Sequence, residues 1–277
     1  MLRNAYGVCL ALLLCLILCL PVLAEETTEL SETTKKIQDN SFMIEEAYNQ
    51  EAGVIQHIQT FQYLEKSHNW AYTFVQEWPV LGQTHQFSYS LPVSHMDDPT
   101  NQTGMNDIAL NYRYQVPLDA PIALAPRFST LFPTGDEKNG FGTGAIGYQI
   151  NIPLSIELSN KFVNHWNVGT TITPHCYGDE GANADTFGLN LGTSLIWLAT
   201  EHFNLMLETM WSSTESVISD GITERADAVF INPGVRYAFD FASGLQIVPG
   251  ISFPIGFGSA AGEVGVLVYL SFEHPLF

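Results

Sequence analysis

Six ionisable residues stand in the middle of segments that otherwise alternate between apolar and polar side chains. They are Glu77, Arg113, Arg127, His165, Glu208 and Arg236. Each falls on the polar side of its alternation, so in a strand its side chain shares a face with other polar groups. Charges of both signs on one such face either form an ion-pair network or select among charged solutes. Which role applies depends on the elements that hold the six residues.

Those elements are alternating segments of roughly 10–14 residues, the length of a tilted strand that spans a bilayer. The alternation is clearest near the end of the chain, where Val264, Val266, Val268, Leu270 and Phe272 occupy every second position. Twelve segments can be counted, at 53–63, 70–80, 84–95, 107–117, 121–133, 144–156, 162–175, 186–199, 203–216, 227–241, 245–257 and 264–274. We interpret the last segment as the strand that closes a barrel against the first, because closure removes unpaired sheet edges.

The connections between the segments are alternately tight and long. Tight ones lie at 81–83, 118–120, 158–160, 200–202 and 242–244, and long, acidic, glycine-rich ones lie at 96–106, 134–143, 176–185 and 217–226. This alternation is typical of outer-membrane barrels, which have short periplasmic turns and longer outer loops. We therefore expect an all-β fold, a single transmembrane antiparallel barrel of about 12 strands over residues 52–277. The alternative is a soluble two-sheet protein. The facing of the first segment stays open, because Val54, Ile55, Ile58 and Phe61 do not alternate.

Both ends of the chain carry features of an exported barrel. Residues 1–24 resemble a cleaved signal peptide, with Arg3, an apolar run from Val8 to Leu20 and the small residue Ala24. The run is short for a membrane-anchoring helix. A final aromatic residue, Phe277, after an alternating strand resembles the insertion signal that the barrel-assembly machinery reads. These features predict location in the outer membrane of a Gram-negative cell.

Residues 25–51 are polar and are expected to form an N-terminal segment in the periplasm. The stretch from Phe42 to Tyr48 could form a short helix that lies under the barrel or folds into it. The alternative is that this segment folds into the barrel and plugs it.

The six charges lie at similar heights when residues are counted from the short turns. Arg113 and Arg127 each stand about seven residues from Ala120, and such a distance corresponds to a rise of roughly 18 Å along a tilted strand. The sequence therefore predicts a belt of charge near the middle of the lumen. The belt is either a structural ion-pair network or a constriction that selects permeants.

Turn positions also predict which charges are cross-strand neighbours. Pairing around an outer loop centred near Ile222 makes Glu208 and Arg236 an ion pair, and pairing around Ala120 sets Arg113 beside Arg127. Two adjacent guanidinium groups repel each other, so something must offset them. The candidates are Glu77, a carboxylate of the N-terminal segment such as Glu45 or Glu46, or a bound anion. We expect the two arginines to form an anion-attracting wall.

Several functions are disfavoured by composition and motifs. The formal net charge of −19 argues against nucleic-acid binding. The predicted mature chain keeps one cysteine, Cys176, so neither a disulfide framework nor a zinc site is expected, and no cofactor is implied. A lipase or esterase needs a reachable Ser–His pair, and no Gly-x-Ser-x-Gly motif is present.

Acidic residues are frequent in the predicted outer loops. These are Asp97, Asp98, Asp136, Glu137, Asp179, Glu180, Asp185, Asp220 and Glu224. They could hold divalent cations against lipopolysaccharide phosphates, or they could be a solvated acidic surface. Membrane lipids and lipopolysaccharide are thus the expected partners of the wall and of the outer loops.

Two stretches resemble a known family. They are NSFMIEEAYNQEAGVIQH at residues 40–57, and FSTLFPTGD at residues 128–136 followed by NGFGTG at residues 139–144. Together they resemble the outer-membrane, transporter-like proteins grouped as the MetA-pathway phenol-degradation family. The resemblance implies a barrel that passes small solutes, with aromatic or hydrophobic compounds as candidates, and brings no catalytic or binding residues with it. The alternatives are a structural barrel with a closed lumen and an outer-membrane lipase or esterase.

Overall fold

The computed structural model describes residues 37, 39–98, 101–178 and 181–276. The chain divides into two compact units, Met1–Lys35 and Lys36–Phe277, and only the second contains described residues. The predicted signal peptide at residues 1–24 and the final Phe277 lie outside the described residues. Among the described residues, no helix is both long enough and apolar enough to cross a membrane.

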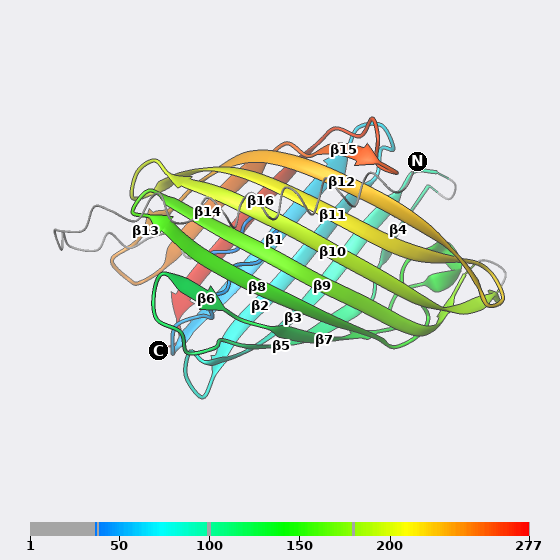
Figure 1. Ribbon diagram of the computed structural model, residues 1–277, viewed down its shortest axis with the longest axis horizontal. Coiled ribbons are helices and arrows are strands. Elements are labelled where there is room, and N and C mark those ends of the chain that lie inside the picture. The colour runs from blue at the N-terminus through cyan, green and yellow to red at the C-terminus, as the bar shows by residue number, and fades with distance from the viewer. Residues whose placement is uncertain (1–36, 38, 99–100, 179–180, 277) are drawn as a thin grey trace, which may run out of the picture. The chain divides into compact units, whose positions relative to one another are not determined.

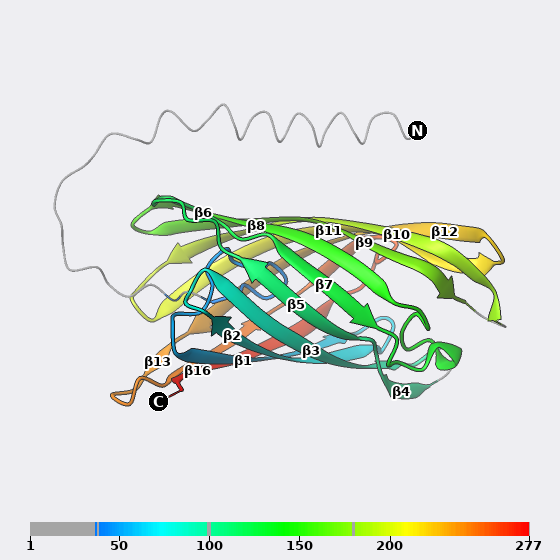
Figure 2. The ribbon, with the colours of Figure 1, turned by 90° about the horizontal axis from the view of Figure 1, so that it is seen from below.

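The second unit is a closed antiparallel barrel of 12 strands (Figures 1 and 2). The strand segments are β1 (Val54–Leu64), β2 (Trp70–Val80), β3 (His85–Met96), β4 (Gln102–Met105), β5 (Ile108–Tyr114), β6 (Ile122–Leu124), β7 (Arg127–Phe132), β8 (Gly147–Ser159), β9 (Phe162–Tyr177), β10 (Asn183–Leu198), β11 (Phe203–Ser219), β12 (Ile222–Tyr237), β13 (Phe239–Asp240), β14 (Gln246–Ser252), β15 (Ile255–Gly258) and β16 (Gly265–Pro275). A 3-10 turn, η1 (Glu137–Asn139), lies between β7 and β8. Four of the barrel strands are interrupted, which is why the segments outnumber the strands.

Closure occurs where it was predicted. β16 pairs with β1 from Val54 opposite Pro275 to Leu64 opposite Gly265. The tight connections at 81–84 and 241–245 lie at one end of the barrel, the turn end, and the long connections lie at the other, the loop end. The predicted fold class is therefore confirmed.

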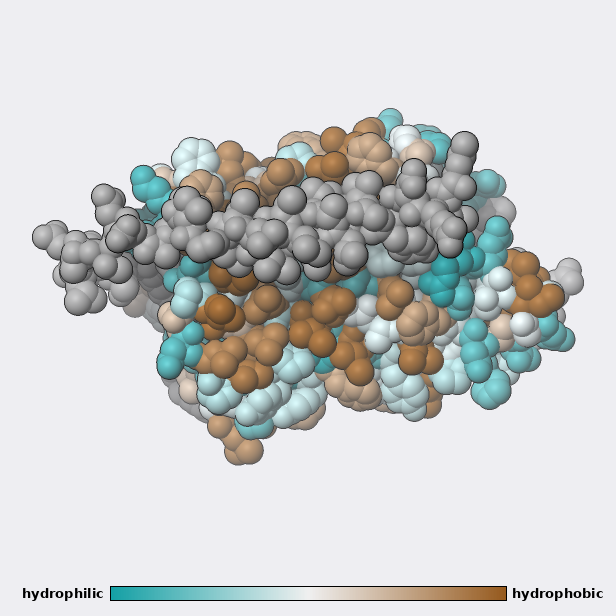
Figure 3. Space-filling view, viewed as in Figure 1, coloured by the Kyte–Doolittle hydropathy of each residue, from teal (hydrophilic) through white to brown (hydrophobic). Residues whose placement is uncertain are grey.

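The outer surface of the wall is apolar. Apolar residues on β5, β8, β12 and β14–β15 face outward and alternate with more buried neighbours, as Tyr148, Ile150 and Ile152 do on β8. Figure 3 shows hydrophobic residues gathered across the middle of the visible wall and strongly hydrophilic ones towards its two ends. Exposed apolar residues in such a band are stable when they contact lipid instead of water.

The structure also resolves the facing of β1. Gln56 and Ile58 point inward, and Ile58 belongs to a buried cluster with Phe42 and Tyr269. An apolar residue inside the lumen breaks the alternation, and this explains why the facing of β1 was not evident from the sequence.

The predicted loop at 217–226 was wrong. β11 and β12 continue as a hairpin to a turn at Asp220 and Gly221, and Gly221 has a positive φ of 68°. The residues before the turn are mostly Ser and Thr, which form strands without an apolar face, so the apolar pattern ends before the strand does. β9 and β10 likewise extend to Tyr177 and from Asn183 into the predicted loop at 176–185.

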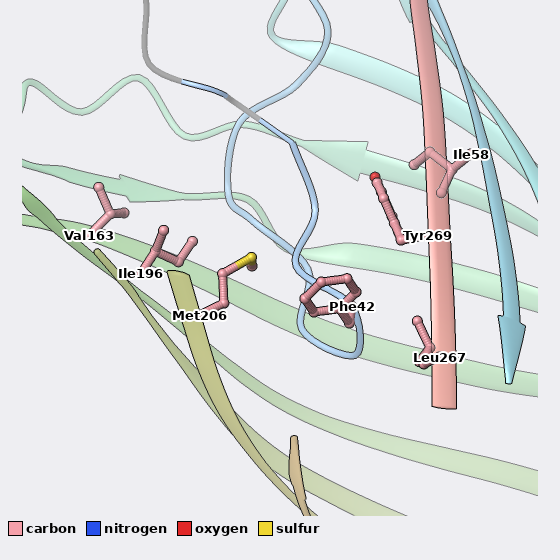
Figure 4. Close-up of a cluster of buried hydrophobic side chains, with 7 residues drawn as sticks. All are labelled: Phe42, Ile58, Val163, Ile196, Met206, Leu267 and Tyr269. Atoms are coloured by element: carbon pink, nitrogen blue, oxygen red, sulfur yellow. The ribbon is translucent and has the colours of Figure 1, made fainter. Parts of the chain in front are cut away.

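Residues 39–50, here called the plug, lie inside the barrel. Ile37 packs on Ala238 and Val248 near the turn end, and the chain reverses where the Ser41 N–H donates to the Ile44 carbonyl at 2.9 Å. It then returns to the turn end and enters β1. In Figure 4 the chain bends sharply at Phe42, inside the ring of strands.

The plug corrects two expectations. The described part of the N-terminal segment is not a free tail, because its residues are buried against the lumen wall, and Phe42–Tyr48 form no helix. The alternative of a plug describes residues 39–50 correctly.

Candidate functional site

The six predicted charges all face the interior. Glu77, Arg113, His165, Glu208 and Arg236 are almost completely buried, and only Arg127 keeps an appreciable exposed fraction, 15% of its side chain. Each contacts the plug or a residue that does. The predicted belt is therefore the surface on which the plug sits.

Arg113 is bound to the backbone of the plug. Its guanidinium donates to the Tyr48 carbonyl at 2.6 Å, to the Glu46 carbonyl at 3.3 Å and to Asn49 Oδ1 at 2.8 Å. Its Nη2 also lies 3.7 Å from the Glu77 carboxylate. An irregular segment buried in a lumen leaves carbonyls without strand partners, and a guanidinium with five donors can satisfy several of them.

Arg236 has the same role on the opposite side of the plug. It donates to the carbonyls of Asp39 at 2.8 Å and Asn40 at 2.9 Å, and to that of Ile37 at 3.3 Å. The predicted Glu208–Arg236 ion pair is wrong, because Glu208 is opposite Asn232 and Arg236 is opposite Asn204. The prediction assumed a loop centred near Ile222, whereas the β11–β12 hairpin turns at Asp220 and Gly221. The residue of β12 opposite Glu208 therefore comes earlier in the chain than predicted.

Arg127 is paired with a carboxylate of the plug. Its Nε and Nη2 donate to Glu45 Oε2 and Oε1 at 3.0 and 2.6 Å. Arg113 and Arg127 are directly opposite each other on β5 and β7, which confirms the predicted register. The expected groups that could offset the two positive charges were Glu77, a carboxylate of the N-terminal segment and a bound anion. In the structure, Glu77 and Glu45 offset them.

The remaining two residues hold the bend of the plug. Glu208 accepts from the Met43 N–H at 3.1 Å and from Asn232 Nδ2 at 2.7 Å. His165 Nδ1 lies 2.7 Å from Ser155 Oγ, which accepts from the Ala47 N–H at 2.8 Å. This Ser–His pair is sealed beneath the plug, with 0% and 2% exposure, and is therefore not the reachable pair that a lipase requires.

Glycines in the wall make room for the apolar tip of the plug. A Cβ at Gly192 would lie 2.2 Å from Ile44 Cδ1, and Cβ atoms at Gly234 and Gly250 would lie 2.5 and 2.8 Å from the Phe42 ring. Glycine inside a strand often marks such a close approach. Phe42 packs between Tyr269, with ring centroids 6.0 Å apart, and the apolar side chains shown in Figure 4.

Asp39 anchors the entry of the plug. Its carboxylate accepts from Gln56 Nε2 at 2.8 Å, from Ser271 Oγ at 2.5 Å and from the Tyr269 hydroxyl. Sequence reasoning did not identify Asp39, Phe42, Ile44 or Asn49 as contact residues. The isolated glycines in the strands were the one available signal that something approaches the wall closely.

The three acidic side chains of the plug differ in their electrostatics. Burial raises the pKa of Glu46 well above its ordinary value, and the neighbouring Asp39 carboxylate raises it further. Burial also raises the pKa of Asp39. Burial acts on Glu45 in the same direction, but the Arg127 and Arg113 guanidinium groups and the hydrogen bonds of the carboxylate together outweigh it, so the pKa of Glu45 lies below its ordinary value.

The lumen is filled on one side of the bend and open on the other. Towards the turn end, a cavity of only about 20 Å³ remains between the plug and residues such as His165, Ile196 and Arg236. Towards the loop end, two cavities of about 390 and 450 Å³ meet at Met43, Ile44, Glu45, Arg127 and Gln149. We call them the apolar lobe and the polar lobe of one chamber.

Both lobes are lined by apolar and polar side chains. The apolar lobe takes its name from Phe42, Ile58, Val75, Ala109 and Leu131, and its lining also includes Thr60, Ser88, Ser90 and Asp107. Hydroxyl and amide side chains predominate in the polar lobe, including Thr143, Asn151, Thr171, Asn190 and Ser212. No group of three or more His, Cys, Asp or Glu able to hold a metal ion occurs among the described residues.

Comparison with solved structures places the fold among outer-membrane channels. An outer membrane channel from Pseudomonas putida F1 matches with a TM-score of 0.62 and 13% identity over 82% of this chain and 97% of that chain. The NanC porin matches with a TM-score of 0.53 and 10% identity, and the KdgM porin with 0.52 and 8%, each over 78% of this chain and 98% of the other. At these identities the likeness shows the fold. No family model matches the chain, and no curated protein matches it.

Proposed function

We propose that this protein is an outer-membrane channel for the passive passage of small solutes, with a lumen narrowed by its own plug. The observation that carries the proposal is a closed barrel with an apolar outer wall and a chamber lined by both polar and apolar side chains. A 12-stranded barrel has an interior between the side-chain-filled core of about 8 strands and the open channel of 16–18 strands. A narrow pore is therefore the expected outcome.

Small aromatic or hydrophobic compounds are the permeants we favour. The resemblance to the MetA-pathway family suggests them, and the apolar lobe offers surface against which they can pack. Anionic members of this class have an additional attraction to Arg127, whose guanidinium opens onto the chamber. No cofactor or energy source is needed for such passage.

The location proposed is the outer membrane, after removal of residues 1–24 and insertion by the barrel-assembly machinery. The turn end then faces the periplasm, and the acidic loop end faces the lipopolysaccharide surface.

A second candidate is a structural barrel with a closed lumen. It is favoured by the plug, whose contacts with the wall near the turn end enclose a cavity of about 20 Å³. The two functions differ in whether the plug ever moves.

The deciding experiment is the swelling of liposomes that contain the folded protein, with a panel of charged and neutral aromatic solutes. Swelling that depends on solute size and charge supports the channel. Liposomes impermeable to the whole panel support the structural barrel, and release of fatty acid from the liposomes would indicate the lipase instead.

A further inference from the structure

Arg127 differs from the other two lumen arginines in its access to free space. The side chains of Arg127 and Glu45 are 15% and 28% exposed, whereas Arg113 and Arg236 are 3% and 2% exposed. Both members of the Arg127–Glu45 pair line both lobes of the chamber. A solute in the chamber can therefore reach this pair but not the other arginines.

The wall holds the Arg127 guanidinium independently of the plug. Nη1 donates to Asn111 Oδ1 at 3.0 Å and to Ser129 Oγ, and Nη2 donates to Gln149 Oε1 at 2.9 Å. These acceptors come from β5, β7 and β8. They fix the plane of the guanidinium, so its Nε–Nη2 edge remains oriented to receive a carboxylate.

Glu45 occupies that edge as a bidentate carboxylate, and its backbone is held separately from its side chain. The Glu45 N–H donates to Asn167 Oδ1 at 2.8 Å, and Asn167 Nδ2 donates to the Glu45 carbonyl at 2.8 Å. The Glu45 carboxylate can consequently leave Arg127 by side-chain rotation while the plug backbone stays in place. Its exposure shows that there is space into which it can turn.

An apolar body fits beside the same guanidinium. The apolar lobe has a volume of about 390 Å³, and Ile58, Val75, Ala109 and Leu131 line it next to Arg127, together with polar residues such as Ser88, Ser90 and Asp107. Pockets that bind small molecules are commonly about 300–1,000 Å³, mostly apolar, with a few fixed polar groups. The lobe and the guanidinium together match a molecule with one carboxylate and one compact apolar part.

We propose that Arg127 and the apolar lobe form a binding site for small apolar monocarboxylates, and that Glu45 is a built-in competitor for that site. The exchange replaces one carboxylate by another on the same guanidinium, and the displaced Glu45 carboxylate turns into the open chamber, where water can solvate it. A bound solute also releases Glu45 from the wall, which couples occupancy of the chamber to the contacts of the plug. The proposal deepens the channel function and names the solute class that the channel would concentrate.

The test is equilibrium binding of benzoate to the folded full-length barrel in detergent, compared with benzyl alcohol as a neutral molecule of similar size. Glu45→Gln weakens the competitor and is expected to tighten benzoate binding by about tenfold, which corresponds to about 1.4 kcal/mol. Arg127→Gln is expected to weaken benzoate binding by a similar factor. Neither change should alter the weak binding of benzyl alcohol.

Matched controls come from a second pair of the same kind. Arg225 Nη2 lies 2.7 Å from Glu215 Oε1, and Glu215 lines the polar lobe but not the apolar lobe. Glu215→Gln and Arg225→Gln therefore test for a general effect of charge in the chamber, and they should change benzoate binding far less than Glu45→Gln and Arg127→Gln do. Folding of every variant is checked by heat-modifiable gel mobility. Benzoate binding that is insensitive to both Glu45→Gln and Arg127→Gln overturns the proposal, as does benzyl alcohol binding as tightly as benzoate.

The binding and swelling measurements distinguish failure of the proposed site from failure of the proposed channel function. Swelling without saturable benzoate binding would leave the channel function standing and remove the site. Benzoate binding that depends on Arg127, without swelling, would keep the site and remove the channel.

Discussion

Arg113 and Arg127 are cross-strand neighbours, yet their guanidinium groups serve different partners. Arg113 is sealed under the plug and bonded to its carbonyls, and Arg127 is bonded to a carboxylate at the edge of an open chamber. Two neighbouring arginines thus have different roles: Arg113 holds the backbone of the plug, and Arg127 presents a positive charge to the chamber.

This contrast predicts different effects for the two substitutions. Arg127→Gln should shift the reversal potential of the channel in a salt gradient towards cations, with a change in selectivity of about fivefold, which corresponds to roughly 1 kcal/mol for a partly exposed charge. Arg113→Gln removes buried donors from plug carbonyls and leaves Glu77 without its counter-charge, at a cost of on the order of 3 kcal/mol to plug docking.

Bilayer recordings distinguish the two variants. Arg113→Gln should raise conductance and increase cleavage of residues 39–50 by added protease, without the selectivity shift of Arg127→Gln. If both substitutions only lower thermal stability and leave conductance and selectivity unchanged, the arginines are structural.

The plug is the element on which the function depends, and its apolar tip is held by shape. Gly192 leaves room for Ile44, and a Cβ at that position would come within 2.2 Å of Ile44 Cδ1. On the same strand, β10, a Cβ at Gly188 would have no neighbour closer than 3.7 Å. The two glycines therefore lie on the same face of the same strand, but only Gly192 contacts the plug.

Gly192→Val should displace the tip of the plug, whereas Gly188→Val should not. Overpacking of this kind usually costs about 1–3 kcal/mol. The expected result for Gly192→Val is a conductance above that of the native protein, with unchanged heat-modifiable mobility of the barrel. Equal conductance of the two variants would mean that Ile44 does not hold the plug.

Docking of the plug should depend on pH in two opposite ways. The raised pKa of Glu46 means that the docked plug binds a proton more tightly than a free plug does, so docking strengthens as the pH falls through that raised pKa. Asp39, whose pKa burial also raises, acts in the same direction. The lowered pKa of Glu45 means that the ion pair with Arg127 contributes above the ordinary carboxyl pKa and is lost as the pH falls through the docked value.

Conductance should therefore pass through a minimum at mildly acidic pH, above the ordinary carboxyl range of about pH 4. The groups around Glu46 are Asp39 and Glu273, which raise its pKa, and Arg236 and Arg113, which lower it. Glu46→Gln should flatten the change on the alkaline side of the minimum, and Glu45→Gln should flatten the change on the acidic side. A conductance that does not vary with pH would contradict this account of docking.

An element could be predicted from the sequence when the contacts that define it join residues close together in the chain. The strands were predictable because alternation is local, and the Arg113–Arg127 register followed from one tight turn near Ala120. The Glu208 register was missed because Ser and Thr continue the β11–β12 hairpin without an apolar signal. Docking of the plug was only an alternative, although Glu45 was among the candidates to offset Arg113 and Arg127, because contacts such as that of Met43 with Glu208 join residues far apart in the sequence.

For the whole molecule, the interior charges, the wall glycines and the plug form one assembly. The barrel supplies a closed wall, and the plug fills the lumen near the turn end while leaving a chamber near the loop end. Under the proposed channel function, solutes pass when the plug shifts. A barrel without a movable plug would be closed to solutes of any charge.

A reversible lock on the plug tests this claim most directly. Ser41 Oγ of the plug lies 2.9 Å from Ser194 Oγ of β10, so cysteines at both positions are placed to form a disulfide after small side-chain rotations. The measurement is the bilayer conductance of Ser41→Cys/Ser194→Cys, with Cys176 replaced by Ser, before and after reduction. We expect the disulfide to form in the folded barrel, the oxidised protein to be silent, and reduction to restore conductance to that of the Ser41→Cys single variant. Equal conductance in the oxidised and reduced states, with the disulfide shown to be present, would contradict the account.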